Sequence, residues 1–188
     1  MALIADPPCR GWTDAMTAFR NALSLLEFSR RPRVPVVLQN EAAECGVACL
    51  AMIGGFHGRM ATLHGLRQQA GVTLRGATLS QLIQVAGSMG LAARPLRLEL
   101  EHLGQLKLPC ILHWQQSHFV VLTKVERGYI RLIDPAKGEC RVPMRDVDQS
   151  FTGVALELTP TADFKVQAPE ARFGILQLWS GITGVAAR

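Results

Sequence analysis

The spacing of hydrophobic residues changes at Leu91, and this change restricts the fold more than any other feature of the chain. Before it, apolar residues recur at helical intervals, whereas after it short β-branched runs alternate with turn residues. Helices followed by strands favour an α+β domain, with N-terminal helices packed on an antiparallel β-sheet. With 188 residues, 48% of them hydrophobic, the chain can form one well-buried domain with extensions.

The helical pattern runs from residue 36 to about residue 92 and predicts three helices. These helices, each ended by glycine, should cover residues 46–53, 62–70 and 78–88. The glycines expected to end them are Gly54 with Gly55, Gly71 and Gly90. Thr62 should cap the second helix, and either Thr78 or Ser80 the third. The predicted strands are residues 92–98, 110–114, 118–125, 129–133, 139–142 and 153–158.

Proline-containing breaks divide the chain into a main domain with an extension on each side. Residues 1–33 are predicted to form an extension with an amphipathic helix and a basic linker. Residues 34–160 form the predicted main domain. Residues 161–188 are a predicted linker followed by an amphipathic segment at 173–185, which leads toward a transmembrane domain absent from this chain. Either extension could contact a membrane surface, although no run of 18 apolar residues is present.

Charge and cysteine content restrict the partners of the chain. Much of the net charge of +5 lies in Arg30, Arg31 and Arg33, which could face anionic lipid or nucleic acid, although a solvated linker is the favoured interpretation. No aromatic-basic patch accompanies these arginines, so we expect no nucleic-acid partner. The five cysteines are odd in number and irregularly spaced, which indicates free thiols in a reducing compartment. No G-x-x-x-x-G-K-[ST] sequence occurs, so no nucleotide or other cofactor is expected within the chain.

Cys45 has the sequence context of a nucleophilic thiol. It lies at the expected start of a helix, where unpaired backbone N–H groups and the helix dipole favour a thiolate. Gly46 follows it and lets a substrate approach the backbone closely. Gln39, six residues earlier, can donate its side-chain amide to the oxyanion of a tetrahedral intermediate, with the Cys45 backbone N–H as second donor.

A base and a group to orient it are predicted on one hairpin. His118 opens the predicted strand 118–125, and Asp134 follows the predicted strand 129–133. A hairpin that turns at residues 126–128 brings the end of its second strand beside the start of its first, so Asp134 should lie next to His118. Together with a cysteine and a glutamine, these residue types make up a thiol protease site.

The same residue types allow a competing interpretation as a zinc site. Cys45, Cys49, His113 and His118 satisfy Cys2His2 spacing, but the segment between Cys49 and His113 is far longer than a zinc-finger loop. We therefore expect no metal site. Cys49 follows Cys45 by one helical turn and is expected in the core. His113 is expected to brace a strand or, together with Trp114, to line a substrate cleft.

The motif formed by Gln39, five residues, Cys45 and a following glycine, with His118 in HFVVL and Asp134 in IDP, resembles a known family. It is similar to the papain-like peptidase domain at the N-terminus of bacteriocin-exporting ABC transporters of the colicin V secretion type. The resemblance covers about residues 34–158. It implies a cysteine endopeptidase with Cys45 as nucleophile, His118 as base, Asp134 as orienting group and Gln39 as oxyanion donor.

Members of that family remove a leader that ends in Gly-Gly or Gly-Ala from a bacteriocin or microcin precursor during export. The resemblance thus implies a precursor peptide as substrate and the transmembrane and ATPase domains of the same transporter as partners. It also implies a position on the cytoplasmic face of the bacterial inner membrane, with ATP bound only at a nucleotide-binding domain absent from this chain. Related domains without the cysteine bind cargo without cutting it. A non-catalytic recruitment module is therefore the alternative, which Cys45 disfavours.

Overall fold

The computed structural model describes residues 33–71, 73 and 76–166. The chain divides between Arg33 and Val34, and the fold described below belongs to the second unit. The amphipathic helix predicted within residues 1–33 and the segment predicted at 173–185 lie outside the described residues. In the part of the chain that is described, no helix is long and apolar enough to cross a membrane.

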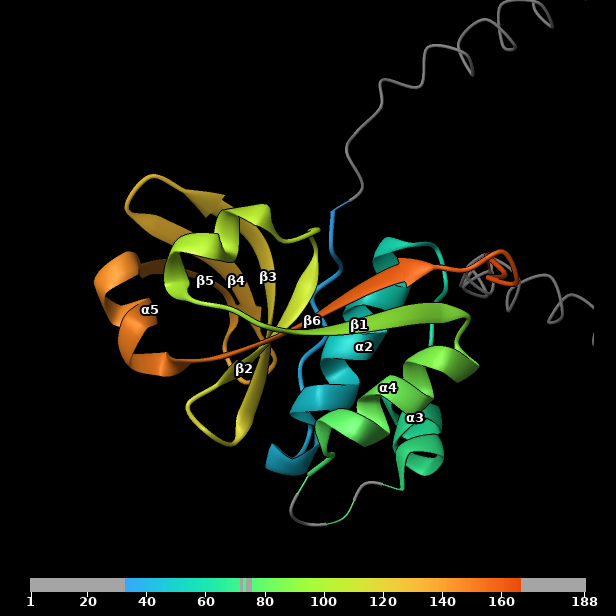
Figure 1. Cartoon of the computed structure of the whole chain (residues 1–188). Coiled ribbons are helices and arrows are strands. Elements are labelled where there is room, and N and C mark those ends of the chain that lie inside the picture. Colours follow the sequence, from blue (N-terminus) through green and yellow to red (C-terminus); the bar gives the residue numbers. More distant parts are fainter. Residues whose placement is uncertain (1–32, 72, 74–75, 167–188) are drawn as a thin grey trace, which may run out of the picture. The chain divides into compact units, whose positions relative to one another are not determined.

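One half of the domain is a six-stranded antiparallel sheet with the strand order β1-β6-β2-β3-β4-β5 (Figure 1). Its strands are β1 (Leu91–Arg97), β2 (Cys110–Trp114), β3 (His118–Glu126), β4 (Tyr129–Asp134), β5 (Gly138–Pro143) and β6 (Phe151–Pro160). Strands β2 to β5 follow one another as hairpins, whereas β6 returns to pair with both β1 and β2. All six predicted strands are present, with ends that differ by at most two residues.

Three helices form the other half, and two of them pack directly against the sheet (Figure 1). They are α2 (Cys45–Phe56), α3 (Leu63–Ala70) and α4 (Leu79–Ser88). Helix α2 contacts β3, and helix α4 contacts β1. Most of α2 is buried, because it lies between the sheet and the other two helices. The predicted fold class, helices packed on an antiparallel sheet, is confirmed.

Local hydrogen bonds at the ends of α3 and α4 confirm the predicted caps. The Thr62 hydroxyl accepts a hydrogen bond from the Gly65 N–H at 3.2 Å. Gly71 then ends α3 in the left-handed conformation, with φ of +57°. Thr78 and Gln81 form a reciprocal capping box at the start of α4. These bonds satisfy backbone N–H groups that have no partner inside the helix.

The prediction that Gly54 and Gly55 end the first helix is wrong, since α2 continues past both of them. Close neighbours explain why glycine occupies these two helical positions. A Cβ atom at Gly54 would lie 2.7 Å from the Met89 side chain, and one at Gly55 would lie 2.7 Å from Pro35. The chain turns away only at Gly58, which has a φ of +90°. The glycine pair therefore permits tight packing rather than stopping the helix.

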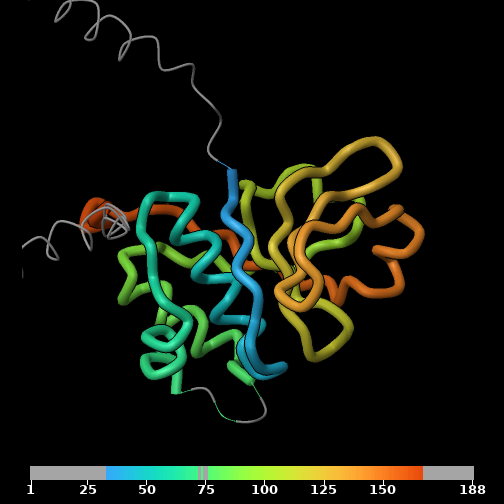
Figure 2. The backbone as a smooth tube through the Cα atoms, turned by 180° about the vertical axis from the view of Figure 1, so that it is seen from behind, coloured from blue at the N-terminus to red at the C-terminus, as the bar shows by residue number. Residues whose placement is uncertain are grey.

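The chain before the first helix is extended, so the prediction that the helical pattern begins at residue 36 is also wrong. Figure 2 shows this segment running between the helices and the sheet. The Gln39 backbone N–H donates to the Pro135 carbonyl at 2.9 Å, which ties the segment to the end of β4. A short 3-10 helix, η1 (Ala42–Glu44), then leads into α2.

Besides η1, two further short helical elements were not predicted, namely η2 (Leu100–Gln105) and α5 (Met144–Ser150). Neither is long enough to show a clear helical period. Their buried residues Leu103 and Val147 belong to a second core that also contains Leu122 of β3. The adjacent Val121 belongs instead to the first core, with the helices. Alternate residues of β3 therefore serve two cores on opposite faces of the strand.

Packing of the domain continues past the boundary predicted at residue 160. The backbone N–H and the hydroxyl of Thr161 both donate to the Gly90 carbonyl at 2.9 Å. Phe164 packs against the first core, and its ring lies edge-on to that of His57 with centroids 6.2 Å apart. The boundary itself remains a prediction, but Phe164 is part of the packed structure.

Candidate active site

Cys45 is the first residue of α2 and is 4% exposed. The extended segment and η1 precede it in the chain, and the apolar residues that follow it in α2 pack in the first core. The backbone N–H groups of a first helical turn have no partner within the helix and favour an anion beside them. The position predicted for the thiol, at the start of a buried helix, is the position that it occupies.

His118 and Asp134 lie side by side at the open end of one hairpin. His118 is the first residue of β3, and Asp134 is the last residue of β4. The His118 Nε2 atom lies 2.7 Å from Asp134 Oδ1. Asp134 is 6% exposed, and Oδ1 also accepts a hydrogen bond from the Ala136 N–H at 2.9 Å. Two donors on one carboxylate oxygen hold it in place, so the His118 ring is oriented by a fixed group.

Helix α2 brings the thiol to the other side of the same imidazole. A hydrogen bond with the Cys45 side chain is the largest cause of a raised pKa at His118; burial opposes it, and Asp134 adds to it. Because Asp134 occupies Nε2, the nitrogen left to face the thiol is Nδ1. The raised pKa favours an imidazolium, the partner that a thiolate needs. The site therefore joins residues from both halves of the domain.

Gln39 reaches this site from the extended N-terminal segment. Its backbone is held by the Pro135 carbonyl, one residue after Asp134. Its side-chain oxygen Oε1 is buried and has no hydrogen-bond partner among the described residues. The residues predicted for the nucleophile, base, orienting group and oxyanion donor thus come from four elements that converge. Their catalytic roles remain predictions at this point.

The polar turn expected at residues 115–117, before His118, is present, but the sequence did not reveal its backbone conformation. Gln115 and Gln116 have φ of +46° and +64°, a conformation that costs free energy in residues other than glycine. Hydrogen bonds hold the turn, since the Gln115 N–H donates to the Ser150 carbonyl at 2.7 Å and the Ser117 N–H donates to the Gln115 carbonyl at 2.9 Å. Glutamine carries no turn signal, so only the surrounding structure imposes this conformation.

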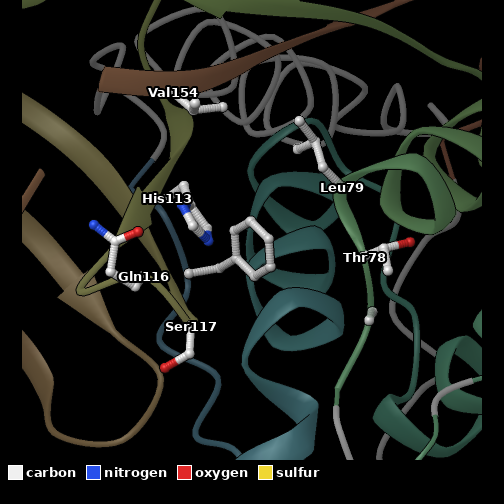
Figure 3. Close-up of a pocket in the computed structure, with 8 residues that line it drawn as sticks. Thr78, Leu79, His113, Gln116, Ser117 and Val154 are labelled. Carbon is white, nitrogen blue, oxygen red and sulfur yellow. The ribbon is translucent and has the colours of Figure 1, made fainter. Parts of the chain in front are cut away.

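A cavity of about 390 Å³ lies beside this turn (Figure 3). Figure 3 shows His113 and Gln116 on one wall and Thr78 and Leu79, from the start of α4, on the other. The lining residues are Ala77, Thr78, Leu79, His113, Gln116, Ser117, Phe119 and Val154. His113 lines this cavity, and it also braces its strand, since its Nδ1 atom lies 2.8 Å from the Thr152 hydroxyl. Two of the lining residues, Ser117 and Phe119, flank His118 in the sequence.

Trp114 does not line this cavity, although it was considered, together with His113, as part of a substrate cleft. It is 7% exposed and belongs to the second core. Strand alternation explains the difference, because neighbouring residues of β2 point to opposite faces of the sheet. His113 therefore faces the cavity, and Trp114 faces the other core.

The zinc interpretation finds no support in the arrangement of these side chains. Among residues 33–71, 73 and 76–166, no three His, Cys, Asp or Glu side chains are grouped so that they could hold a metal ion. Cys49 is fully buried in the first core, and burial raises the pKa of its thiol well above the ordinary value. His113 is engaged by Thr152, and its pKa is lowered by burial. Cys49 therefore has the core position expected of it.

Residues 33–163 match the peptidase C39 family. The chain belongs to this family. The C39 domain is 44% identical over 167 residues to a colicin V secretion/processing ATP-binding protein of Escherichia coli. It is 42% identical over 168 residues to a probable microcin-H47 secretion/processing ATP-binding protein of the same species. Each comparison covers 89% of this chain, which spans only 24% of the length of either relative.

A solved structure is similar to the C39 domain in both fold and sequence. It is the crystal structure of a double glycine motif protease from an AMS/PCAT transporter in complex with the leader peptide. The TM-score is 0.67 and the identity 40%, and the match covers 70% of this chain and 94% of the other. The C39 domain is therefore a cysteine peptidase with a papain-like α+β fold, as the resemblance in the sequence implied.

Proposed function

We propose that this C39 peptidase removes the double-glycine leader from a bacteriocin or microcin precursor, with Cys45 as the nucleophile. The observation that carries the proposal is that His118 Nε2 lies 2.7 Å from Asp134 Oδ1, while the Cys45 thiol is close enough to the same imidazole to raise its pKa. A nucleophile, a base and a group that orients the base, each within hydrogen-bond reach of the next, are the requirements of an activated thiol. Gln39 is the proposed oxyanion donor.

The proposed reaction passes through an acyl-thioester. The Cys45 thiolate attacks the carbonyl carbon of the second small residue, and the oxyanion accepts hydrogen bonds from the Gln39 amide and the Cys45 backbone N–H. The peptide bond breaks as the His118 imidazolium protonates the leaving amine, and the leader stays on Cys45 as a thioester. Water then attacks the thioester carbonyl and gives its proton to His118, which restores the thiolate–imidazolium pair.

The known relatives, and a cavity lined by Ser117 and Phe119 on either side of His118 in the sequence, support a leader peptide as substrate. The solved relative is a double glycine motif protease bound to a leader peptide, and the Escherichia coli relatives are secretion/processing proteins. The cavity is lined partly by the apolar Leu79, Phe119 and Val154. It can take one apolar side chain of an extended leader, while the two small residues lie at the thiol.

The proposed partners are the transmembrane and ATPase domains of a transporter. The relatives are ATP-binding secretion proteins about four times longer than this chain, since the chain spans 24% of their length. We expect the domain to work on the cytoplasmic face of the bacterial inner membrane, which is the side on which precursor peptides are made. The proposed reaction needs no metal or nucleotide within this chain, because thiolate, imidazole and amide groups supply each step.

Mass spectrometry of a panel of double-glycine leader peptides, incubated with the protein and with the Cys45→Ala variant, tests this function. Cleavage after the Gly-Gly or Gly-Ala pair is expected with the intact thiol only. Binding of the same peptides, measured by fluorescence anisotropy, should be equal for both proteins, because the substitution removes one sulfur atom.

Two other outcomes would contradict the proposed function. Equal binding without cleavage by either protein would instead favour a module that recruits cargo without cutting it. If the peptides are neither bound nor cleaved, double-glycine leaders are excluded as the substrate class.

A further inference from the structure

Glu44 is a buried carboxylate in the loop that separates the two proposed oxyanion donors. It directly precedes Cys45, and its side chain is 4% exposed. Acidic side chains are rarely buried to this extent unless they are paired and hydrogen-bonded. The contacts of this carboxylate therefore indicate which parts of the chain it holds in place.

The Glu44 carboxylate turns back toward the residues that follow Gln39. Its Oε2 atom accepts hydrogen bonds from the backbone N–H groups of Asn40 at 3.0 Å and Glu41 at 3.2 Å. Its Oε1 atom accepts a hydrogen bond from Arg67 Nη1 of α3 at 3.1 Å. One side chain thus links the start of the loop, its end and a neighbouring helix.

These contacts restrict the backbone on the C-terminal side of Gln39, and a separate bond restricts it on the N-terminal side. The Gln39 N–H is held by the Pro135 carbonyl at 2.9 Å, beside Asp134. The next two N–H groups are held by Glu44. The peptide units around Gln39 are therefore fixed relative to both Asp134 and Cys45.

Arg67 pairs with this buried carboxylate. Its Nη1 atom contacts Glu41 Oε1 at 2.9 Å as well as Glu44 Oε1 at 3.1 Å. Burial of a carboxylate is costly unless the group is paired and hydrogen-bonded, and the guanidinium supplies this pairing. The pairing allows Glu44 to remain buried while it accepts the two backbone hydrogen bonds.

We infer that Glu44 is a positioning residue for the oxyanion hole: it fixes the Asn40–Glu41 turn and thereby sets where the Gln39 amide points. This inference rests on the proposed function, because it assigns the purpose of a loop within the same site. Hydrogen-bond donors to an oxyanion act only when they are held in place before the reaction. Loss of Glu44 should therefore slow the chemical step rather than weaken substrate binding.

Glu157 of β6 provides a matched control for the stability effect of losing a buried carboxylate. It is 3% exposed, pairs with Arg94 at 3.3 Å and accepts a hydrogen bond from the Lys107 N–H at 2.8 Å. Its partners are remote in the fold from Gln39 and Cys45. Glu157→Ala should lower the melting temperature and leave kcat unchanged.

The test is a double-mutant cycle between Glu44→Ala and Gln39→Ala, with kcat and KM measured for leader cleavage. Gln39→Ala should lower kcat about a hundredfold, as expected for loss of an oxyanion donor. Glu44→Ala should lower kcat at least about tenfold, with KM changed less than about threefold. In the Gln39→Ala background, Glu44→Ala should have almost no further effect on kcat, because the amide that it positions is already gone.

Glu44→Gln keeps a carbonyl oxygen for the two backbone N–H groups and loses the charge that faces Arg67. It should recover part of the activity lost in Glu44→Ala, and it carries the cycle if the alanine variant does not fold. Equal losses of kcat in the presence and absence of Gln39 would overturn the inference. The inference would also be overturned if Glu44→Ala lowered the melting temperature and left kcat unchanged, which is the result expected for the control Glu157→Ala.

Hydrolysis of p-nitrophenyl acetate separates this inference from the proposed function. This ester also passes through an oxyanion at Cys45 but needs no leader peptide. If the protein cuts no double-glycine peptide yet hydrolyses the ester, the substrate class is wrong and the cycle is measured on the ester. A Glu44→Ala variant that hydrolyses the ester at the full rate would then overturn the positioning role alone.

Discussion

His118 is the residue on which the chemistry of the site depends, since it pairs with the Asp134 carboxylate and interacts with the Cys45 thiol. Its pKa is raised chiefly by the Cys45 side chain and further by Asp134, against the effect of burial. The imidazolium is therefore favoured more strongly in the folded state than in a free histidine. That charge state is the one required to stabilise a thiolate and to protonate the leaving amine.

The raised pKa of His118 predicts a pH dependence of stability with a definite sign. A group whose folded pKa exceeds its unfolded value contributes its full stability below the unfolded pKa, about 6.5 for histidine, and loses it as pH rises through the folded pKa. The difference in melting temperature between the protein and a His118→Asn variant should therefore be largest in mild acid and shrink toward alkaline pH.

Comparison with the His118→Asn variant is needed because two other histidines act in the opposite direction. Burial lowers the pKa of both His57 and His113, so the stability that these two residues contribute to the fold is lost as pH falls. Both remain in the variant and cancel from the difference. A difference in melting temperature that stays constant from mild acid to mild alkali would rule out the proposed charge on His118.

The two polar partners of the hairpin should differ in their effect on rate. His118→Ala is expected to lower kcat/KM for leader cleavage at least about a hundredfold, because it removes the proton donor and acceptor. Asp134→Ala should lower it less, because the β3–β4 hairpin still holds His118 near the thiol. An unchanged rate in His118→Ala would remove it from the mechanism. Equal losses in both variants would show that the hairpin cannot orient the ring alone.

At the scale of elements, the packing of α2 against α4 and β3 positions the nucleophile. A Cβ atom at Gly46 would lie 2.9 Å from both methyl groups of Leu82 and 3.3 Å from the Phe119 ring. Leu82 is fully buried and has little room to move. Glycine therefore follows Cys45 because the helix start lies very close to two neighbouring elements.

Gly46→Ala is expected to destabilise the domain by about 1–3 kcal/mol through overpacking. Gly87→Ala is the matched control, since a Cβ atom at this exposed position of α4 meets nothing within 4 Å. It should stabilise the domain by about 0.5–1 kcal/mol, because alanine favours a helix more than glycine does. Urea unfolding measures both free energies. A Gly46→Ala variant as stable as the original protein would show that Leu82 can yield.

At the scale of the whole molecule, the site lies where the helical half meets the sheet. Cys45 comes from the helices and the His118–Asp134 pair from the sheet, while Gln39 comes from the segment that runs between them (Figure 2). Anything that loosens the contact of the two halves should therefore affect the site. Packing that spans both halves is provided by the first core, which includes Phe164 at its edge.

The extent of the domain can be tested by comparing chains that end at residues 160 and 166. The shorter chain loses the two Thr161 hydrogen bonds to the Gly90 carbonyl and the packing of Phe164. It should be less stable by about 1–3 kcal/mol, measured by urea unfolding. Phe164→Ala in the longer chain should account for much of this difference. Equal stability of the two chains would support the predicted boundary at residue 160.

Local patterns in the sequence were sufficient for the strands, the caps and the hairpin that joins His118 to Asp134. Alternation of side chains along a strand and the need of a first helical turn for a capping oxygen act within a few residues. A hairpin also brings its two ends together without help from the rest of the chain. These features, with the motif around Cys45, were enough to predict the fold class and the candidate site.

Contacts between distant segments decided the rest. Gly54 and Gly55 remain helical because Met89 and Pro35 pack against them, and Gln115 and Gln116 adopt positive φ because neighbouring segments hold the turn. The link between thiol and imidazole likewise exists only after α2 has packed on β3. Free energies of a few kcal/mol from tertiary packing outweigh local conformational preferences of about 1 kcal/mol, so such features have no signature in the sequence nearby.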